Sequence, residues 1–162
     1  MKNIVLIGMP GSGKTTISKA LKDKTGWDLI DLDEFLVQHF QMSIPEMFAI
    51  SEDYFRDHET QVCHLLKNKH RTILSCGGGV ILRKENMDAL KENGVICLLN
   101  RDLDKIINDV DTTSRPLLKE GKHKIKTLYE KRWPLYESSA DIVIDNNGTI
   151  QSTIEQLEKL MK

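Results

Sequence analysis

The sequence predicts a doubly wound α/β domain, in which helices cover both faces of a parallel β-sheet. Three observations support this fold class. Five short apolar runs alternate along the chain with segments of helical periodicity. The first, third and fourth runs are predominantly apolar, as expected for strands that are buried on both faces. The chain of 162 residues, with 40% hydrophobic and 29% charged residues, suits one domain with a substantial core.

Each expected strand is a short run that glycine or polar residues end. The first, NIVLI, precedes a glycine-rich loop, and the third, TILSC, is followed by three glycines. The second, WDLIDLD, alternates apolar residues with acids, whereas VICLL and DIVID are the fourth and fifth. The expected strands are residues 3–7, 27–33, 72–76, 95–99 and 141–145.

The expected helices begin and end at residues that favour helix termini. Gly26 suits the end of the first helix, where glycine readily takes the left-handed conformation, and Gly94 ends a later helix. Ser43 opens a capping box and Ser51 is a second N-cap, so the helical stretch 43–68 divides into two helices. The expected helices are residues 15–24, 43–68 (as two), 84–93, 102–110, 125–137 and 149–162, and residues 111–123 have loop composition.

Composition and charge argue against several functional classes. The net charge of -1, from 23 basic and 24 acidic residues, does not favour nucleic acid or an anionic membrane as a partner. No apolar run approaches the length of a membrane span. Three widely spaced cysteines without a CxxC pair fit reduced thiols better than disulfides or a zinc site. We therefore expect a cytoplasmic protein, by default a monomer.

A glycine-rich motif follows the first strand. Residues 8–15, GMPGSGKT, match the phosphate loop G-x-x-x-x-G-K-[ST] between a strand and a helix, as its mechanism requires. Backbone N–H groups of such a loop face phosphate oxygens, the lysine reaches the β- and γ-phosphates, and the final hydroxyl binds Mg²⁺. The nucleotide-binding residues are then Gly11, Ser12, Gly13, Lys14, Thr15 and Thr16.

The motif alone leaves the class of nucleotide user open. A GTPase would carry an N-K-x-D segment after a later strand, and the sequence has none. A motor or a large ATPase would need a longer chain. A small-molecule kinase fits the size.

Two acids at the end of the second expected strand indicate an acceptor site. Asp31 and Asp33 are two residues apart, so in an extended chain both side chains point the same way. Phosphoryl transfer to an alcohol needs one carboxylate to orient the hydroxyl and accept its proton, and another group to help hold hydrated Mg²⁺. The two acids could serve these needs, or they could be solvated residues at a strand end.

Three further segments carry residues that suit a kinase. Arg56 and Glu59 share a helix face, either in a site or as a surface ion pair. The glycines at 77–79 allow the backbone to approach a ligand closely. Arg115 lies in the longest loop, which could close as a lid that excludes water and stabilises phosphoryl charge. Arg132 precedes the last strand.

Taken in order, these segments resemble the shikimate kinase family. The family pattern joins the phosphate loop to D-x-D, F-R-x-x-E, G-G-G, R-P-L-L and R-x-P-L-Y-x-x-x-A-D. Here these motifs stand at residues 8–15, 31–33, 55–59, 77–79, 115–118 and 132–141, along essentially the whole chain. The resemblance implies a P-loop α/β/α domain over residues 1–162 with sheet order 2-3-1-4-5, acceptor-binding helices at about 34–66 and a lid at about 109–123.

The resemblance also implies an activity, the ATP-dependent phosphorylation of the 3-hydroxyl of shikimate on the route to chorismate and the aromatic amino acids. It implies that Asp33 orients the attacking hydroxyl, that Asp31 acts on Mg²⁺ through water, and that Lys14 and Arg115 stabilise phosphoryl charge. Two arginines would grip the shikimate carboxylate. The implied shikimate-binding residues are Asp33, Arg56, Glu59, Gly77, Gly78, Gly79 and Arg132.

One departure and two alternatives accompany this interpretation. Asn108 stands where members of the family often have an arginine that stacks on adenine, and backbone near residues 145–148 could form that wall instead. A gluconate-type sugar acid kinase would also use two arginines for a carboxylate, although the G-G-G and R-x-P-L-Y spacing favours shikimate. A non-catalytic relative would commonly lose the lysine or the acids, which are present here.

Overall fold

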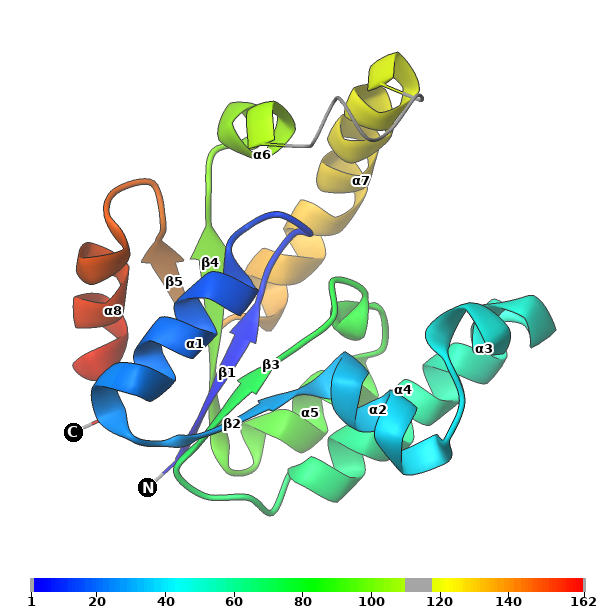
Figure 1. The fold of residues 1–162 in the computed structure, drawn as a ribbon, viewed down its shortest axis with the longest axis horizontal. Coiled ribbons are helices and arrows are strands. Elements are labelled where there is room, and N and C mark those ends of the chain that lie inside the picture. The colour runs from blue at the N-terminus through cyan, green and yellow to red at the C-terminus, as the bar shows by residue number, and fades with distance from the viewer. Residues whose placement is uncertain (1, 110–117, 162) are drawn as a thin grey trace.

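Five parallel strands form one sheet at the centre of the computed structural model, which describes residues 2–109 and 118–161 (Figure 1). The strand order is β2-β3-β1-β4-β5, which confirms the order 2-3-1-4-5. The central strand β1 pairs with β3 and β4, and Leu6 lies opposite Ser75 on one side and Cys97 on the other. The strands are β1 Asn3–Ile7, β2 Asp28–Asp31, β3 Thr72–Ser75, β4 Gly94–Asn100 and β5 Ile142–Asp145.

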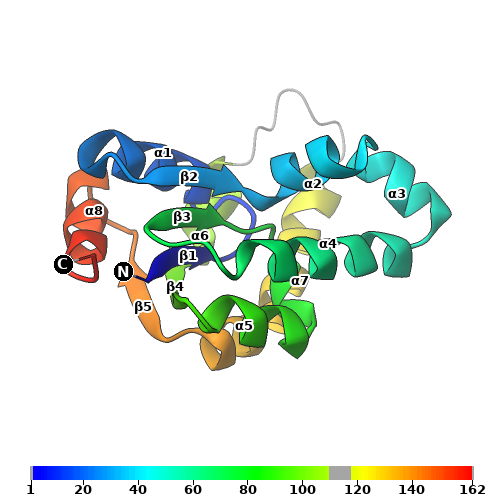
Figure 2. The ribbon, with the colours of Figure 1, turned by 90° about the horizontal axis from the view of Figure 1, so that it is seen from below.

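Helices cover both faces of the sheet, so the predicted three-layer architecture is confirmed (Figure 2). Alternate β1 side chains face opposite cores, with Ile4 and Leu6 against α1 and α8, and Val5 and Ile7 on the side of α4 and α5. The helices are α1 Lys14–Thr25, α2 Leu32–Phe40, α3 Ile44–Ile50, α4 Glu52–Leu66, the 3₁₀ turn η1 Val80–Leu82, α5 Lys84–Lys91, α6 Leu103–Asp109, α7 Leu118–Ser139 and α8 Ile150–Glu158.

The predicted helix boundaries in the first half of the chain are confirmed by their hydrogen bonds. Gly26 ends α1 with φ 76°, and its N–H donates to Lys22 O at 2.8 Å. Ser43 Oγ accepts the backbone N–H of Glu46 at 3.2 Å, and Ser51 Oγ caps α4 in the same way. The long helical stretch therefore divides into α3 and α4 at Ser51.

The segment after β2 differs from its prediction. The expected strand 27–33 ends at Asp31, and residues 32–40 form α2, which periodicity did not predict. Asp31 Oδ1 accepts the backbone N–H of Glu34 at 3.1 Å, so the first acid caps the helix. Asp33 consequently lies in the first helical turn, and the argument from an extended chain is wrong.

Helix α7 begins earlier than predicted. It starts at Leu118 instead of residue 125, so part of the expected loop 111–123 is helical. The remainder of the expected lid, residues 110–117 with Arg115, lies outside the described residues. Helix α7 has 22 residues. In the described part of the chain, no helix has both the length and the apolarity needed to cross a bilayer.

A close contact in the core makes a test of the packing. Gly94 begins β4 beside β1, and a Cβ there would lie 2.5 Å from Leu90 O and 2.9 Å from a Val5 methyl group. We expect Gly94→Ala to lower the free energy of unfolding by about 1–3 kcal/mol, because backbone atoms must shift to admit the methyl group. Urea denaturation measures the change. Gly148→Ala is the control, since the added Cβ meets only the movable Ser152 hydroxyl, and an equal loss in both variants would contradict the packing argument.

Candidate active site

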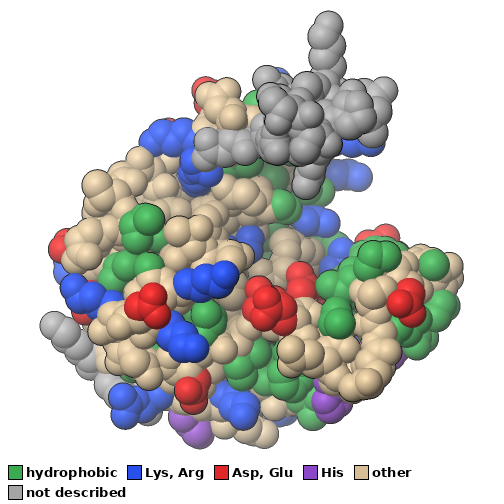
Figure 3. Space-filling model, in the orientation of Figure 1, with side chains coloured by type: hydrophobic (Ala, Val, Ile, Leu, Met, Phe, Trp, Pro, Cys, Tyr) green, Lys and Arg blue, Asp and Glu red, His purple; other side chains and the backbone are tan. Residues whose placement is uncertain are grey.

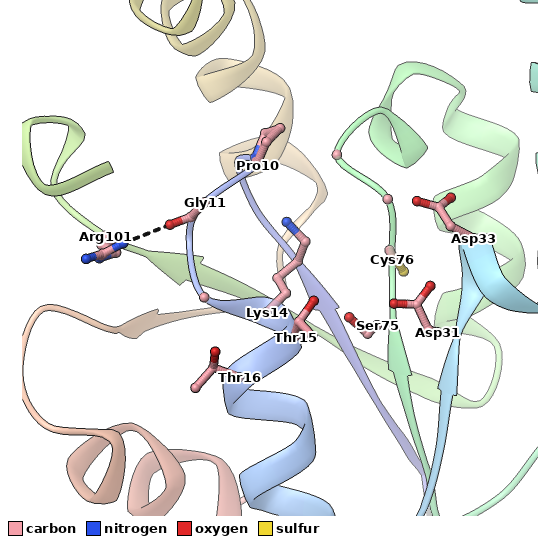
Figure 4. A pocket seen from close by; sticks show the side chains of 13 residues that line it. Pro10, Gly11, Lys14, Thr15, Thr16, Asp31, Asp33, Ser75, Cys76 and Arg101 are labelled. Carbon is pink, nitrogen blue, oxygen red and sulfur yellow. Dashed lines mark hydrogen bonds between the residues drawn. The ribbon is translucent and has the colours of Figure 1, made fainter. Parts of the chain in front are cut away.

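A cavity of about 570 Å³ opens at the carboxyl ends of the central strands, where doubly wound sheets bind their ligands (Figure 4). Figure 3 shows the same face hollowed between the α2–α3 segment and the rest of the domain, with charged side chains at the edges. The cavity is lined by Pro10, Gly11, Gly13, Lys14, Thr15, Thr16, Asp31, Asp33, Ser75, Cys76, Gly77, Gly78 and Arg101.

The phosphate loop lies where the sequence predicts it, between β1 and α1. Gly11 and Gly13 have φ angles of 83° and 96°, a conformation that side chains disfavour, so the loop depends on glycine at both positions. Gly13 is the N-cap of α1 and no side chain caps that end of the helix. The first backbone N–H groups of α1 are therefore oriented to receive an anion, assisted by the helix dipole.

Lys14 projects from the first turn of α1 into the cavity (Figure 4). Its Nζ donates to Gly8 O at 2.7 Å and to Met9 O at 3.0 Å, which holds the ammonium over the loop. Burial lowers the pKa of Lys14 to about 8, although the charges of Asp33 and Asp31 act in the opposite direction. The lysine is thus a positive charge held at the centre of the site.

Asp31 and Asp33 both line the cavity, although they come from a strand end and a helix turn (Figure 4). Burial raises the pKa of Asp33 above its ordinary value, and the neighbouring Asp31 raises it further, while Lys14 and Arg56 lower it. The Thr15 hydroxyl lines the same cavity as these carboxylates, and a divalent cation would relieve the repulsion between the two acids. This donor set fits Mg²⁺, which takes few protein oxygens and keeps several waters.

Arg56 and Glu59 form a buried ion pair, which excludes the alternative of a surface helix pair. Arg56 Nη1 donates to Glu59 Oε1 at 3.0 Å, and the two residues are only 9% and 3% exposed. Glu52 Oε1 lies 3.5 Å from Arg56 Nε, and the guanidinium lies over the Phe55 ring at 5.0 Å. Burial raises the pKa of Glu59, and Arg56 offsets part of that rise. Glu59 is therefore placed to hold the arginine.

The three glycines after β3 each approach a different predicted site residue. A Cβ on Gly77 would lie 3.0 Å from Asp33 Oδ1, and one on Gly78 would lie 3.3 Å from Arg132 Nη1. A Cβ on Gly79 would lie 2.5 Å from both terminal nitrogens of Arg56. The glycine turn thus brings together an acid and two arginines that are far apart in sequence.

Arg132 is positioned by α7. Tyr136 lies one turn further along the helix and is fully buried. Its hydroxyl donates a hydrogen bond to Gly78 O, which attaches α7 to the glycine turn. Burial raises the pKa of Tyr136, and Arg132 offsets part of the rise through its charge and a hydrogen bond. The helix and the turn therefore form one wall.

Three lining residues were not predicted from the sequence, namely Ser75, Cys76 and Arg101, and a fourth, Pro10, lies within the predicted phosphate loop. Arg101 Nη1 donates to Gly11 O at 3.0 Å (Figure 4). Ser75 ends β3, and Arg101 directly follows β4, so the rule that ligands collect at strand carboxyl ends could have identified them. Burial raises the pKa of Cys76 well above its ordinary value, so this thiol is a small uncharged wall residue.

The two remaining expectations concern the nucleotide base. Asn108 is exposed on α6. The expected alternative wall, residues 145–148, does lie beside the phosphate loop, because Asn146 Nδ2 donates to Ser12 O at 2.6 Å.

The sheet order and the phosphate loop define the class, a P-loop nucleotide-binding protein. The model of the shikimate kinase family matches residues 10–162. A shikimate kinase of Clostridium beijerinckii is 42% identical over 162 residues, covering 99% of this chain and 96% of its relative. The chain therefore belongs to the shikimate kinase family.

Solved structures of the family have the same fold. The shikimate kinase from Acinetobacter baumannii in complex with shikimate aligns with a TM-score of 0.86 at 29% identity, covering 99% of this chain and 93% of that chain. The shikimate kinase from Bacteroides thetaiotaomicron gives a TM-score of 0.86 at 28% identity, covering 99% and 98%. Both alignments extend over nearly the whole chain.

The lowered pKa of Lys14 predicts a pH dependence of nucleotide binding. The ammonium is present below a pH of about 8 and is lost above it, so affinity for Mg·ADP is expected to fall by about tenfold between about pH 7 and about pH 9. Calorimetric titration at several pH values measures this fall. Lys14→Arg keeps its charge throughout that range and should lose the dependence. The same fall in both proteins would contradict the assignment to Lys14.

Proposed function

We propose that this protein transfers the γ-phosphoryl group of ATP to the 3-hydroxyl of shikimate, on the route to chorismate and aromatic amino acids. The observation that carries the proposal is the glycine turn, where Gly77, Gly78 and Gly79 meet Asp33, Arg132 and Arg56. Gly77 and Gly78 of this turn line the same cavity as the phosphate loop, whereas Gly79, Arg56 and Arg132 are not among its lining residues. A donor site and a site for a hydroxylated carboxylate are therefore adjacent.

The two arginines suit the carboxylate of the acceptor. Arg56 is buried and already donates to Glu59, while its Nε has no hydrogen bond within the described part of the chain. Arg132 approaches the same glycine turn from α7. A carboxylate bound between them would gain charge-assisted hydrogen bonds in a partly desolvated position. Asp33 and the backbone N–H groups of the glycines remain for the hydroxyl groups of the acceptor.

Asp33 is the proposed general base. The hydroxyl oxygen of the acceptor bonds to the γ-phosphorus as the bond from that phosphorus to the bridging oxygen of ADP breaks. The hydroxyl proton passes to an Asp33 carboxylate oxygen, and ADP leaves. The raised pKa of Asp33 makes it a better proton acceptor than an exposed aspartate.

The remaining assignments concern charge and environment. Lys14 and Arg115 would stabilise the transferring phosphoryl group, and Thr15 with Asp31, through water, would hold Mg²⁺. Bound there, Mg²⁺ would neutralise phosphate charge.

The proposed partners are ATP and shikimate. The protein would be a cytoplasmic monomer that binds neither nucleic acid nor membrane. Three unpaired, buried cysteines support a reducing compartment.

A steady-state assay tests the proposal directly. Release of ADP is followed with ATP, Mg²⁺ and a panel of hydroxy acids that includes shikimate and gluconate. Turnover of shikimate is the expected result, and phosphorylation of its 3-hydroxyl can be established by NMR of the product. Turnover of gluconate without shikimate would refute the proposal.

Replacement of the general base should separate chemistry from binding. Asp33→Asn is expected to lower kcat by about 10² or more, because the amide cannot accept the hydroxyl proton. The Kd for Mg·ADP, measured by calorimetry, should stay close to that of the wild type. Near-normal turnover in this variant would remove Asp33 from the mechanism.

The carboxylate clamp predicts a selective loss of acceptor affinity. Arg56→Ala and Arg132→Ala are each expected to raise KM for shikimate about 30-fold, equivalent to about 2 kcal/mol, with KM for ATP little changed. Arg83→Ala is the matched control, because that arginine pairs with exposed Asp57 and is not among the groups that approach the three glycines. An unchanged KM for shikimate in both clamp variants would contradict the assignment.

A further inference from the structure

The turn that follows β5 contacts the phosphate loop from outside the cavity. Asn146 Nδ2 donates to Ser12 O at 2.6 Å, and its backbone N–H donates to Asn100 O at 2.8 Å. Asn146 Oδ1 accepts the Thr153 hydroxyl at 2.7 Å. Thr153 lies on α8 and is fully buried. The Ser12 carbonyl can only accept, so the amide nitrogen faces the loop and the amide oxygen faces the Thr153 hydroxyl.

The contact controls one peptide unit of the phosphate loop. A trans peptide is planar, so its carbonyl and N–H point in opposite directions. With Ser12 O held by Asn146, the N–H of Gly13 is directed away from Asn146, and Gly13 lines the cavity. The approach is close, because a Cβ on Gly13 would lie 2.7 Å from Asn146 Nδ2. Gly13 and Asn146 therefore depend on one another.

Asn146 contacts the loop and does not itself line the cavity. Arg101 holds the neighbouring carbonyl of Gly11 in a comparable way, but Arg101 also lines the cavity and could contact a ligand itself. Asn146 is not among the residues that line the cavity. Its effect on a bound phosphate must pass through the Ser12–Gly13 peptide.

We propose that Asn146, oriented by Thr153, is a positioning residue that holds the Gly13 N–H toward the phosphate chain of the bound nucleotide. The inference rests on the proposed binding of ATP at this loop. A backbone donor held in place before the nucleotide arrives does not have to be reoriented when it binds. The affected ligand is the polyphosphate, and neither the base nor the acceptor is involved.

The test compares two ligands by calorimetry, Mg·ADP and magnesium tripolyphosphate. Asn146→Ala is expected to raise the Kd for both about tenfold, as loss of one positioned hydrogen bond would, while KM for shikimate stays within about twofold. Thr153→Val should produce a smaller rise of the same kind, and Thr153→Ser should restore wild-type affinity. Gln151→Ala, which removes an exposed amide from the same helix, is the matched control.

Three results would overturn the inference. One is an unchanged Kd for both ligands in folded Asn146→Ala, and another is a rise for Mg·ADP alone, which would assign Asn146 to the nucleoside. The third is an equal loss for ATP and shikimate with a lowered Tm, which indicates a general structural role. If Asn146→Ala does not fold, Thr153→Val is judged by the same results. Failure of the proposed function would appear differently, as wild-type protein that binds Mg·ADP but does not turn over shikimate.

Discussion

The close approach of side chains to the backbone at Gly77–Gly79 is the constraint on which the site depends. Any side chain on Gly79 would displace the Arg56 guanidinium, and one on Gly77 would press on Asp33. The turn follows β3, which lies next to the central strand β1. Asp33 on α2, Arg56 on α4 and Arg132 on α7 therefore meet close to the phosphate loop that follows β1. The Gly78 carbonyl in the same turn accepts a hydrogen bond from the Tyr136 hydroxyl. The turn therefore determines both how α7 packs and how the site residues are arranged.

Charges of alternating sign, two of them buried and two half-buried, lie next to one another in the site, which lowers the free-energy cost of removing them from water. Lys14, Asp33, Arg56 and Glu59 form a series in which each group lowers the electrostatic cost of burying the next. Burial shifts the pKa of Lys14 downward and those of Asp33 and Glu59 upward, and the neighbours oppose those shifts. Removal of Arg56 would leave Glu59 as an uncompensated buried charge, which is strongly unfavourable. The site is therefore both a reactive centre and a coupled part of the core.

The phosphate loop, in contrast, is supported from segments that contribute no motif. Arg101 after β4 and Asn146 after β5 each bind an outward-facing carbonyl of the loop, and Thr153 on α8 orients the second. These contacts connect the loop to the far edge of the sheet. A glycine-rich loop has little conformational preference of its own, so hydrogen bonds from its surroundings select the conformation in which the N–H groups face a ligand.

The sequence by itself determined the fold class, the position of the phosphate loop and many of the residues that line the cavity, since strand periodicity, glycines and capping serines are local properties. Local patterns could not show that Asp31 would cap α2 and so place Asp33 on a helix. Nor could they show that Arg56 and Glu59 would be buried as a pair, because burial depends on which elements pack together. Only the tertiary structure decided that Asn146 supports the loop, since residues 12 and 146 meet only when β1 and β5 lie in one sheet.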